Sequence, residues 1–369
     1  MGENMRLKTR PVLVSRKPNG HSTCTLIGPR QVLVLGETTG VATPCAIVTV
    51  LPSGEVETEP VECPLPIGVH FHSACLIGKY VYIYGGRFVF GFHDDGSASY
   101  RKSPDLWRFH IRRRSWQQQD GGGSEVPWPK AMYGHTSTNI DERLFVAGSW
   151  ERGGRDCSIY NPIARSWEQK PRACEKVCLA GSVVVDGVLH CFGGWGGAGP
   201  SALWSSCNLS DFSWTKHPDM PFTADSPAVW SLPPYIVVCG GSGHKETHAL
   251  HLGSGEWEHW GHALGGAGER VAACPLDSAT TFIHSRSGSY IVTSETMVRR
   301  ERDNRKRAER EAKREAERER VAAFNAAVSL AADGKISEEI ERLAPRVEST
   351  LHHLRAVIPT PDTDMSAGT

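Results

Sequence analysis

The stretch HSACLIGKYVYIYGG, His72–Gly86, decides the fold of this chain. Two short apolar runs flank a Gly-Lys turn, and a Gly-Gly pair closes the second run. The chain then reaches DLWRFHIRRRSW, which ends at Trp116. Short runs rich in Val, Ile and Tyr that are bounded by turn residues are typical of β-strands. The stretch therefore predicts a compact antiparallel unit that ends in a Trp-bearing strand.

The same unit returns three more times along the chain. VCLAGSVVVDGVLHCFGG leads to Trp214, and SPAVWSLPPYIVVCGG leads to Trp257. A degenerate copy, GHTSTNIDERLFVAGSW, leads to Trp167. Successive repeat-ending Trp residues are 51, 47 and 43 residues apart. A repeat of this length built from short strands indicates the blade of a β-propeller.

These copies resemble the kelch repeat over roughly residues 20–293. A His precedes the first strand at His21, His72 and His135, and an apolar run precedes each Gly-Gly. The resemblance implies four-stranded blades that converge on a central axis. Gly pairs let the backbones crowd there, and the repeat-ending Trp residues pack between neighbouring blades. We expect these Trp residues to be part of the core.

Two weaker copies bring the number of blades to six. The first, GHSTCTLIGPRQVLVLGETTG, has the single Gly36, and the last, residues 267–293, has three strands and no Trp. The strand-like segment Arg10–Ser15 has no partner in the first copy. We expect it to supply the outer strand of blade six, because closure removes exposed sheet edges. Residues 1–293 are thus predicted to form an all-β, six-bladed kelch-type propeller.

The chain changes character after Thr293. Residues 295–333 contain neither Gly nor Pro, and from Arg299 to Arg320 acidic and basic residues recur at helical spacing. Ser294 is a suitable helix cap. A second stripe of Ile and Leu follows Gly334. We expect residues 294–358 to form a helical, coiled-coil-like tail, used for self-association or for a second protein, and residues 359–369 to be disordered.

Bulk composition excludes several classes. The 41 basic residues balance 41 acidic ones, so no global charge favours nucleic acid. No apolar run is long enough for a membrane span. Eleven Cys without a signal-peptide pattern indicate a reducing compartment. We expect a cytoplasmic protein; nuclear import through the basic residues 299–307 is the alternative.

Motifs for cofactors and metals are weak. Gly194, Gly196 and Gly199 match a dinucleotide-binding pattern, but a strand and not a helix follows them. Cys174 and Cys178 have the wrong spacing for a zinc hairpin. His70 and His72 could share one side of a strand, although the repeat already accounts for His72. We therefore expect no cofactor, no metal and no catalytic residues.

The candidate partner-binding residues lie in the loops that follow the Gly pairs. The kelch resemblance places these loops, together with the connections between blades, on one face, which we call the loop face. They are rich in aromatic and Arg residues, as interface hot spots are. The candidates are Arg87, Phe88, Phe90, Phe92, Trp150, Arg152, Arg155, Trp195, His244 and Lys245.

The sequence thus predicts a non-catalytic scaffold or adaptor that binds a protein partner through the loop face. The kelch resemblance also leaves an enzyme open, a sugar isomerase or a metal-dependent lyase that uses the central channel. A channel lined by several carboxylates, His or Tyr would favour the enzyme. A channel lined by backbone and Gly would favour the scaffold.

Overall fold

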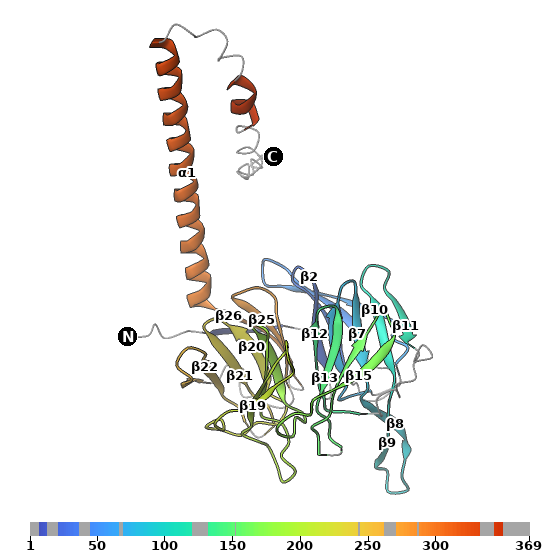
Figure 1. The fold of residues 1–369 in the computed structure, drawn as a ribbon. Coiled ribbons are helices and arrows are strands. Elements are labelled where there is room, and N and C mark those ends of the chain that lie inside the picture. The colour runs from blue at the N-terminus through green and yellow to red at the C-terminus, as the bar shows by residue number, and fades with distance from the viewer. Residues whose placement is uncertain are drawn as a thin grey trace, which may run out of the picture. The chain divides into compact units, whose positions relative to one another are not determined.

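The computed structural model describes residues 7–12, 21–36, 45–65, 69–119, 132–151, 153–242, 244–261, 271–285, 288–332 and 343–349. The chain divides into two compact units, Met1–Val298 and Arg299–Thr369. The first unit holds six four-stranded antiparallel sheets (Figure 1). Innermost strands of consecutive sheets contact one another, and the last contacts the first, so the sheets close into a six-bladed β-propeller.

The first three blades follow the chain in order. Blade one consists of β2 (Thr23–Gly28), β3 (Gln31–Leu35), β4 (Cys45–Val50) and β5 (Val56–Pro60). Blade two consists of β6 (Ser73–Ile77), β7 (Tyr80–Tyr84), β10 (Leu106–His110) and β11 (Ser115–Gln119). Between its second and third strands it carries a separate hairpin, β8 (Arg87–Phe92) and β9 (Ala98–Lys102). Blade three consists of β12 (Thr136–Ile140), β13 (Arg143–Ala147), β14 (Cys157–Asn161) and β15 (Ser166–Lys170).

The last three blades complete the ring. Blade four consists of β16 (Gly181–Val185), β17 (Val188–Phe192), β18 (Trp204–Asn208) and β19 (Trp214–Lys216). Blade five consists of β20 (Ala228–Leu232), β21 (Tyr235–Cys239), β22 (Thr247–His251) and β23 (Trp257–Gly261). Blade six consists of β24 (Ala272–Pro275), β25 (Thr280–Ser285), β26 (Gly288–Ser294) and β1 (Leu7–Val12).

Blade six joins the two ends of the propeller sequence. β1 pairs antiparallel with β26, from Leu7 opposite Ser294 to Val12 opposite Ser289. This outer strand begins three residues before the predicted segment Arg10–Ser15, and residues 13–15 lie outside the described residues. Because the strand begins at Leu7, Leu7 and Val12 pack against two different apolar clusters, one on each side of blade six.

The repeat-ending Trp residues lie at the outer strands, and one of the four is fully buried. Trp167 is 3% exposed, with the rings of Tyr84 and Tyr160 at 4.9 and 5.2 Å. The remaining three are half-buried, and Trp116 donates its indole N–H to the Glu62 carbonyl at 2.7 Å. The core prediction is therefore right for Trp167 and too strong for the others, because the outer strand leaves part of each indole in solvent.

The Gly pairs lie where one blade meets the segment that leads into the next. A Cβ on Gly85 would lie 2.5 Å from the Met132 carbonyl oxygen, and one on Gly193 would lie 2.3 Å from that of Ala224. The backbone φ angles of these two glycines are +65° and +67°. Crowding and left-handed backbone together explain why the repeat needs Gly at these positions.

A series of backbone hydrogen bonds runs around the axis from blade two to blade six, just before the innermost strands. His21, Phe71, Gly134, Leu179 and Ser226 all have a φ between +54° and +71°. The N–H of Gly134 donates to the Phe71 carbonyl at 2.9 Å, and the N–H of Leu179 donates to the Gly134 carbonyl at 2.8 Å. Blades five and six continue the series in the same way. These bonds fix one mouth of the central channel.

The tail begins with a long helix, α1 (Glu295–Ala332). The predicted cap is present, since the Met297 N–H donates to Ser294 Oγ at 3.3 Å. Residues 343–349 are also helical. Of the Ile and Leu stripe predicted after Gly334, Leu343 lies in this segment, whereas Ile340, Leu351 and Leu354 lie outside the described residues. In the part of the chain that the structure describes, no helix combines the length and apolar character needed to cross a bilayer.

Candidate functional site

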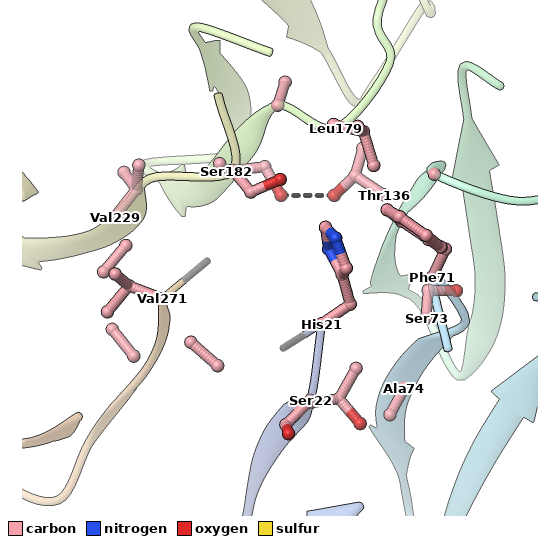
Figure 2. Close-up of a pocket in the computed structure, with 18 of the residues that line it drawn as sticks. His21, Ser22, Phe71, Ser73, Ala74, Thr136, Leu179, Ser182, Val229 and Val271 are labelled. Atoms are coloured by element: carbon pink, nitrogen blue, oxygen red, sulfur yellow. Dashed lines mark hydrogen bonds between the residues drawn. The ribbon is translucent and has the colours of Figure 1, made fainter. Parts of the chain in front are cut away.

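A cavity of about 230 Å³ lies along the propeller axis. The innermost strands of all six blades line it, mostly with Ser, Thr, Ala, Gly and His. Figure 2 shows the His21 ring projecting into this cavity. On one side Thr136 and Ser182 hydrogen-bond to each other and so connect blades three and four. No Asp or Glu belongs to the lining that the described residues form.

Histidines are among the titratable side chains of the channel. His72 Nε2 lies 3.0 Å from Thr23 Oγ1 of the neighbouring blade, so its hydrogen bond crosses between blades. Burial lowers the pKa of His72 to about 3 and that of His135 to about 4. Both rings are therefore neutral at physiological pH. The nearby hydroxyls of Ser73 and Ser137 have no hydrogen-bond partner among the described residues. Three His side chains line the channel, as the enzyme alternative expects, but no carboxylate belongs to the lining that the described residues form.

The buried histidines predict an acid-sensitive fold. In the unfolded chain a His accepts a proton near pH 6.5. Stability from the neutral rings is thus complete above pH 6.5 and is lost as the pH falls toward 4 for His135 and 3 for His72. We expect His135→Leu to reduce the loss of stability between pH 6.5 and 4 by about 3 kcal/mol. Denaturant unfolding across this range tests it, and an unchanged pH slope would contradict it.

A row of aromatic rings continues from the channel mouth across three blades. We call Phe71, Tyr100, Tyr133, Trp150 and Trp195 the aromatic rim. The centroids of Phe71 and Tyr133 are 5.9 Å apart, those of Tyr133 and Trp150 are 6.1 Å apart, and those of Trp150 and Trp195 are 5.9 Å apart. Phe71 also lines the cavity, so the rim borders the channel.

Arg87 anchors the first part of the rim. Its guanidinium carbon lies 4.8, 4.4 and 5.3 Å from the ring centroids of Phe71, Tyr100 and Tyr133. Its Nε donates to His70 Nε2 at 2.8 Å. A cation enclosed by ring faces in this way adds favourable electrostatic contacts. Arg87 is thus both a predicted partner-binding residue and the side chain that holds the rim together.

The remaining candidates of blade two lie on the hairpin β8–β9. Phe88 is half-buried and packs against the core cluster between blades one and two. Phe90 and Phe92 are 59% and 75% exposed, and the guanidinium carbon of Arg101 lies 3.6 Å from the Phe90 ring centroid. The expected loop is therefore a hairpin, which extends from blade two (Figure 1). Phe88 supports the hairpin, while Phe90 and Phe92 stay available for a partner.

Among the candidates of blades three and four, two belong to the aromatic rim and one supports its own loop. Trp150, which is 37% exposed, and Trp195, which is half-buried, form the end of the aromatic rim. Arg155 is exposed and donates from Nε to the Ala173 carbonyl, and so supports its own loop. Arg152 lies outside the described residues.

The two candidates of blade five do not belong to the aromatic rim. Lys245 is exposed. His244 instead lies beside Glu246 and His248, with one ligand atom of each residue within 4.8 Å of the others. Burial lowers the pKa of His248 to about 4 and also lowers that of His244. This cluster was not predicted from the sequence, although the alternation His-x-Glu-x-His is typical of one side of a strand.

Three of the five rim rings were also not predicted from the sequence. Phe71 and Tyr133 come from the segments that lead into blades two and three, and Tyr100 comes from β9. Lys176, whose Nζ lies 5.3 Å from the Trp150 ring centroid, comes from the connection before β16. The expectation that connections between blades share the loop face could have drawn attention to Tyr133 and Lys176.

Comparison with known proteins supports the fold alone. No family model matches the chain, and no curated protein matches it. Among solved structures, the chain is similar to the one titled "Structure of YjhT", with a TM-score of 0.59 and 12% identity. The match covers 76% of this chain and 95% of that chain. Together with the sheet order, this similarity defines the chain as a six-bladed β-propeller with a helical C-terminal segment.

Proposed function

We propose that the protein is a non-catalytic scaffold of the kelch type that binds a protein partner through the aromatic rim and the hairpin β8–β9. The observation that carries the proposal is the continuous series of ring contacts from Phe71 through Tyr133 and Trp150 to Trp195, with Arg87 and Lys176 over its rings. Aromatic and Arg side chains supply most of the binding energy in protein interfaces.

The shape of the site favours a protein over a small molecule. Phe90, Phe92, Tyr100 and Trp150 are 37–75% exposed and extend over the loop face beyond the channel mouth. The channel itself holds about 230 Å³, less than the several hundred Å³ of typical ligand pockets. A broad aromatic surface beside a narrow polar channel suits an extended segment of another protein.

The charges on this surface indicate what the partner carries. Arg87, Arg101 and Lys176 lie over rim or hairpin rings. The carboxylate of Glu151 pairs with Lys102. Cations next to exposed aromatic rings favour a segment in which acidic residues alternate with apolar ones.

The tail offers a second interface. Val321, Phe324 and Val328 lie at helical spacing on one side of α1 and are 50%, 68% and 51% exposed. We propose that this stripe serves self-association or a second protein, so that the chain connects two partners. The location we propose is the cytoplasm, because all eleven cysteines are free thiols.

Losing the rim should abolish binding without unfolding the propeller. We expect the double variant Trp150→Ala, Trp195→Ala to recover at least about tenfold less partner from a lysate than the wild-type chain, since hot-spot residues contribute about 2 kcal/mol or more each. The readout is quantitative mass spectrometry of proteins captured on the full chain. The control is Ile163→Ala, which removes a 94% exposed side chain in the turn between β14 and β15.

The same experiment separates the scaffold from an enzyme. His135→Leu changes the channel and leaves the rim rings in place. Under our proposal this variant keeps its partner. Capture that survives the loss of both Trp residues but is lost with His135 would contradict the proposal and move the site into the channel.

A further inference from the structure

Blade five carries three potential metal ligands in five residues. In HKETH, residues 244–248, His and Glu alternate as His244, Glu246 and His248, just where β22 begins. Alternate residues of an extended chain point to the same side. Accordingly, one nitrogen or oxygen atom of each residue lies within 4.8 Å of the other two.

The two imidazoles already have the spacing of a coordination site. His244 Nε2 lies 3.3 Å from His248 Nδ1. Two nitrogens bound tetrahedrally to zinc, each at about 2.0–2.1 Å, would be separated by about 3.3–3.4 Å. Phe222 stacks on both rings, with centroids at 4.4 and 4.1 Å and interplanar angles of 10° and 22°. This shared contact holds both rings beside each other, with their planes inclined by 32°.

A third histidine supports the carboxylate. His259 of β23 is the cross-strand neighbour of His248. Its Nε2 lies 3.2 Å from Glu246 Oε2, and the ring centroids of His248 and His259 are 5.0 Å apart. Partners of this kind orient ligands in many metal sites, and their loss weakens metal binding.

We propose that His244, Glu246 and His248 bind Zn²⁺, or a divalent transition metal with the same ligand preference, through two imidazole nitrogens and one carboxylate oxygen. His259 acts as a positioning residue for Glu246. Two His and one carboxylate are a common zinc ligand set that leaves a fourth position open. The side chains of Glu246 and His259 are 40% and 55% exposed, so water or a donor group from a partner can reach that position.

The location lets the metal connect a loop to the sheet of blade five. His244 follows Gly240-Gly241, in the loop between the second and third strands of blade five. Trp150 and Trp195 occupy the equivalent loops of blades three and four. A metal held by His244 in the loop and His248 in β22 would tie this loop to the sheet. It would thereby fix part of the loop face.

The test is metal binding by the full chain, purified without a polyhistidine tag and stripped with a chelator. Titration with Zn²⁺ against a chromophoric chelator measures stoichiometry and affinity, and Co²⁺ reports a tetrahedral site by its visible absorption. The variants are His244→Ala and His248→Ala. The matched control is His251→Ala, three residues along the same strand, whose Nδ1 accepts a hydrogen bond from the Ser254 N–H.

We expect one equivalent of Zn²⁺ in the wild-type chain and in His251→Ala, and none in His244→Ala or His248→Ala. His259→Gln should bind about 10–100-fold more weakly. Circular dichroism of the chelator-treated variants shows that each remains folded. If the wild-type chain binds no stoichiometric metal, or if the ligand variants bind as tightly as His251→Ala, the cluster is a hydrogen-bonded surface network and the proposal is wrong.

Discussion

Gly148→Ala should destabilise the propeller by about 4 kcal/mol or more, the largest effect we expect from a single methyl group. Gly148 has a φ of +81°, and a Cβ there would lie 1.6 Å from the Val177 carbonyl oxygen and 2.6 Å from its carbon. The left-handed backbone alone costs a residue such as Ala about 1–2 kcal/mol. The clash adds to this, because blade three would have to move away from the segment that leads into blade four.

A matched glycine isolates the contribution of the clash. Gly187 has a φ of +75° in the turn between β16 and β17, and a Cβ there would have no neighbour within 4 Å. Gly187→Ala should therefore cost only the backbone term, about 1–2 kcal/mol. Denaturant unfolding of the two variants compares them. Equal losses would show that blades three and four are not crowded at Gly148.

Deletion of residues 1–12 should cause the second large loss of stability. The deletion removes β1. Six residues of β26 thereby lose their strand partner, and the apolar contacts of Leu7 and Val12 are lost. We expect a loss of roughly 3–5 kcal/mol, from about 1 kcal/mol for each half-buried apolar side chain and somewhat less for each ladder hydrogen bond. For a domain of this size the melting temperature should fall by about 10 °C.

The exposed edge of β26 should also promote aggregation, because an unpaired strand edge can pair with another chain. A chain shortened by twelve residues at the C-terminus is the control. Light scattering during thermal melting reports both effects. If the N-terminal deletion melts like the control, β1 does not close the ring.

The blades could be predicted from sequence because they depend on local constraints. Gly85 and Gly193 are needed where backbones approach within a few ångströms, and this need marks the sequence at a fixed spacing. The outer strand of blade six was harder to place, since its register depends on the apolar clusters that receive Leu7 and Val12. Those clusters exist only after the ring closes.

The candidate site could be predicted only in part, because it forms between blades. The loop residues Arg87, Trp150 and Trp195 were found from their position after the repeat glycines. Arg87 contacts Tyr133 of the next blade and Trp150 contacts Trp195 of the next blade, and no sequence spacing predicts those contacts. The approach of His259 to Glu246 similarly depends on the pairing of β22 with β23, which shifts register after Thr247.

The most direct test of the central claim, that the aromatic rim binds a protein, is site-specific photo-crosslinking in cells. A photoreactive phenylalanine derivative replaces Trp150 in one full-length variant and Ile163 in another; both side chains are exposed, at 37% and 94%. We expect a discrete crosslinked protein at position 150 that is absent at position 163 and reduced when Trp195 is also changed to Ala. No protein crosslink at position 150, or the same products at both positions, would contradict the account.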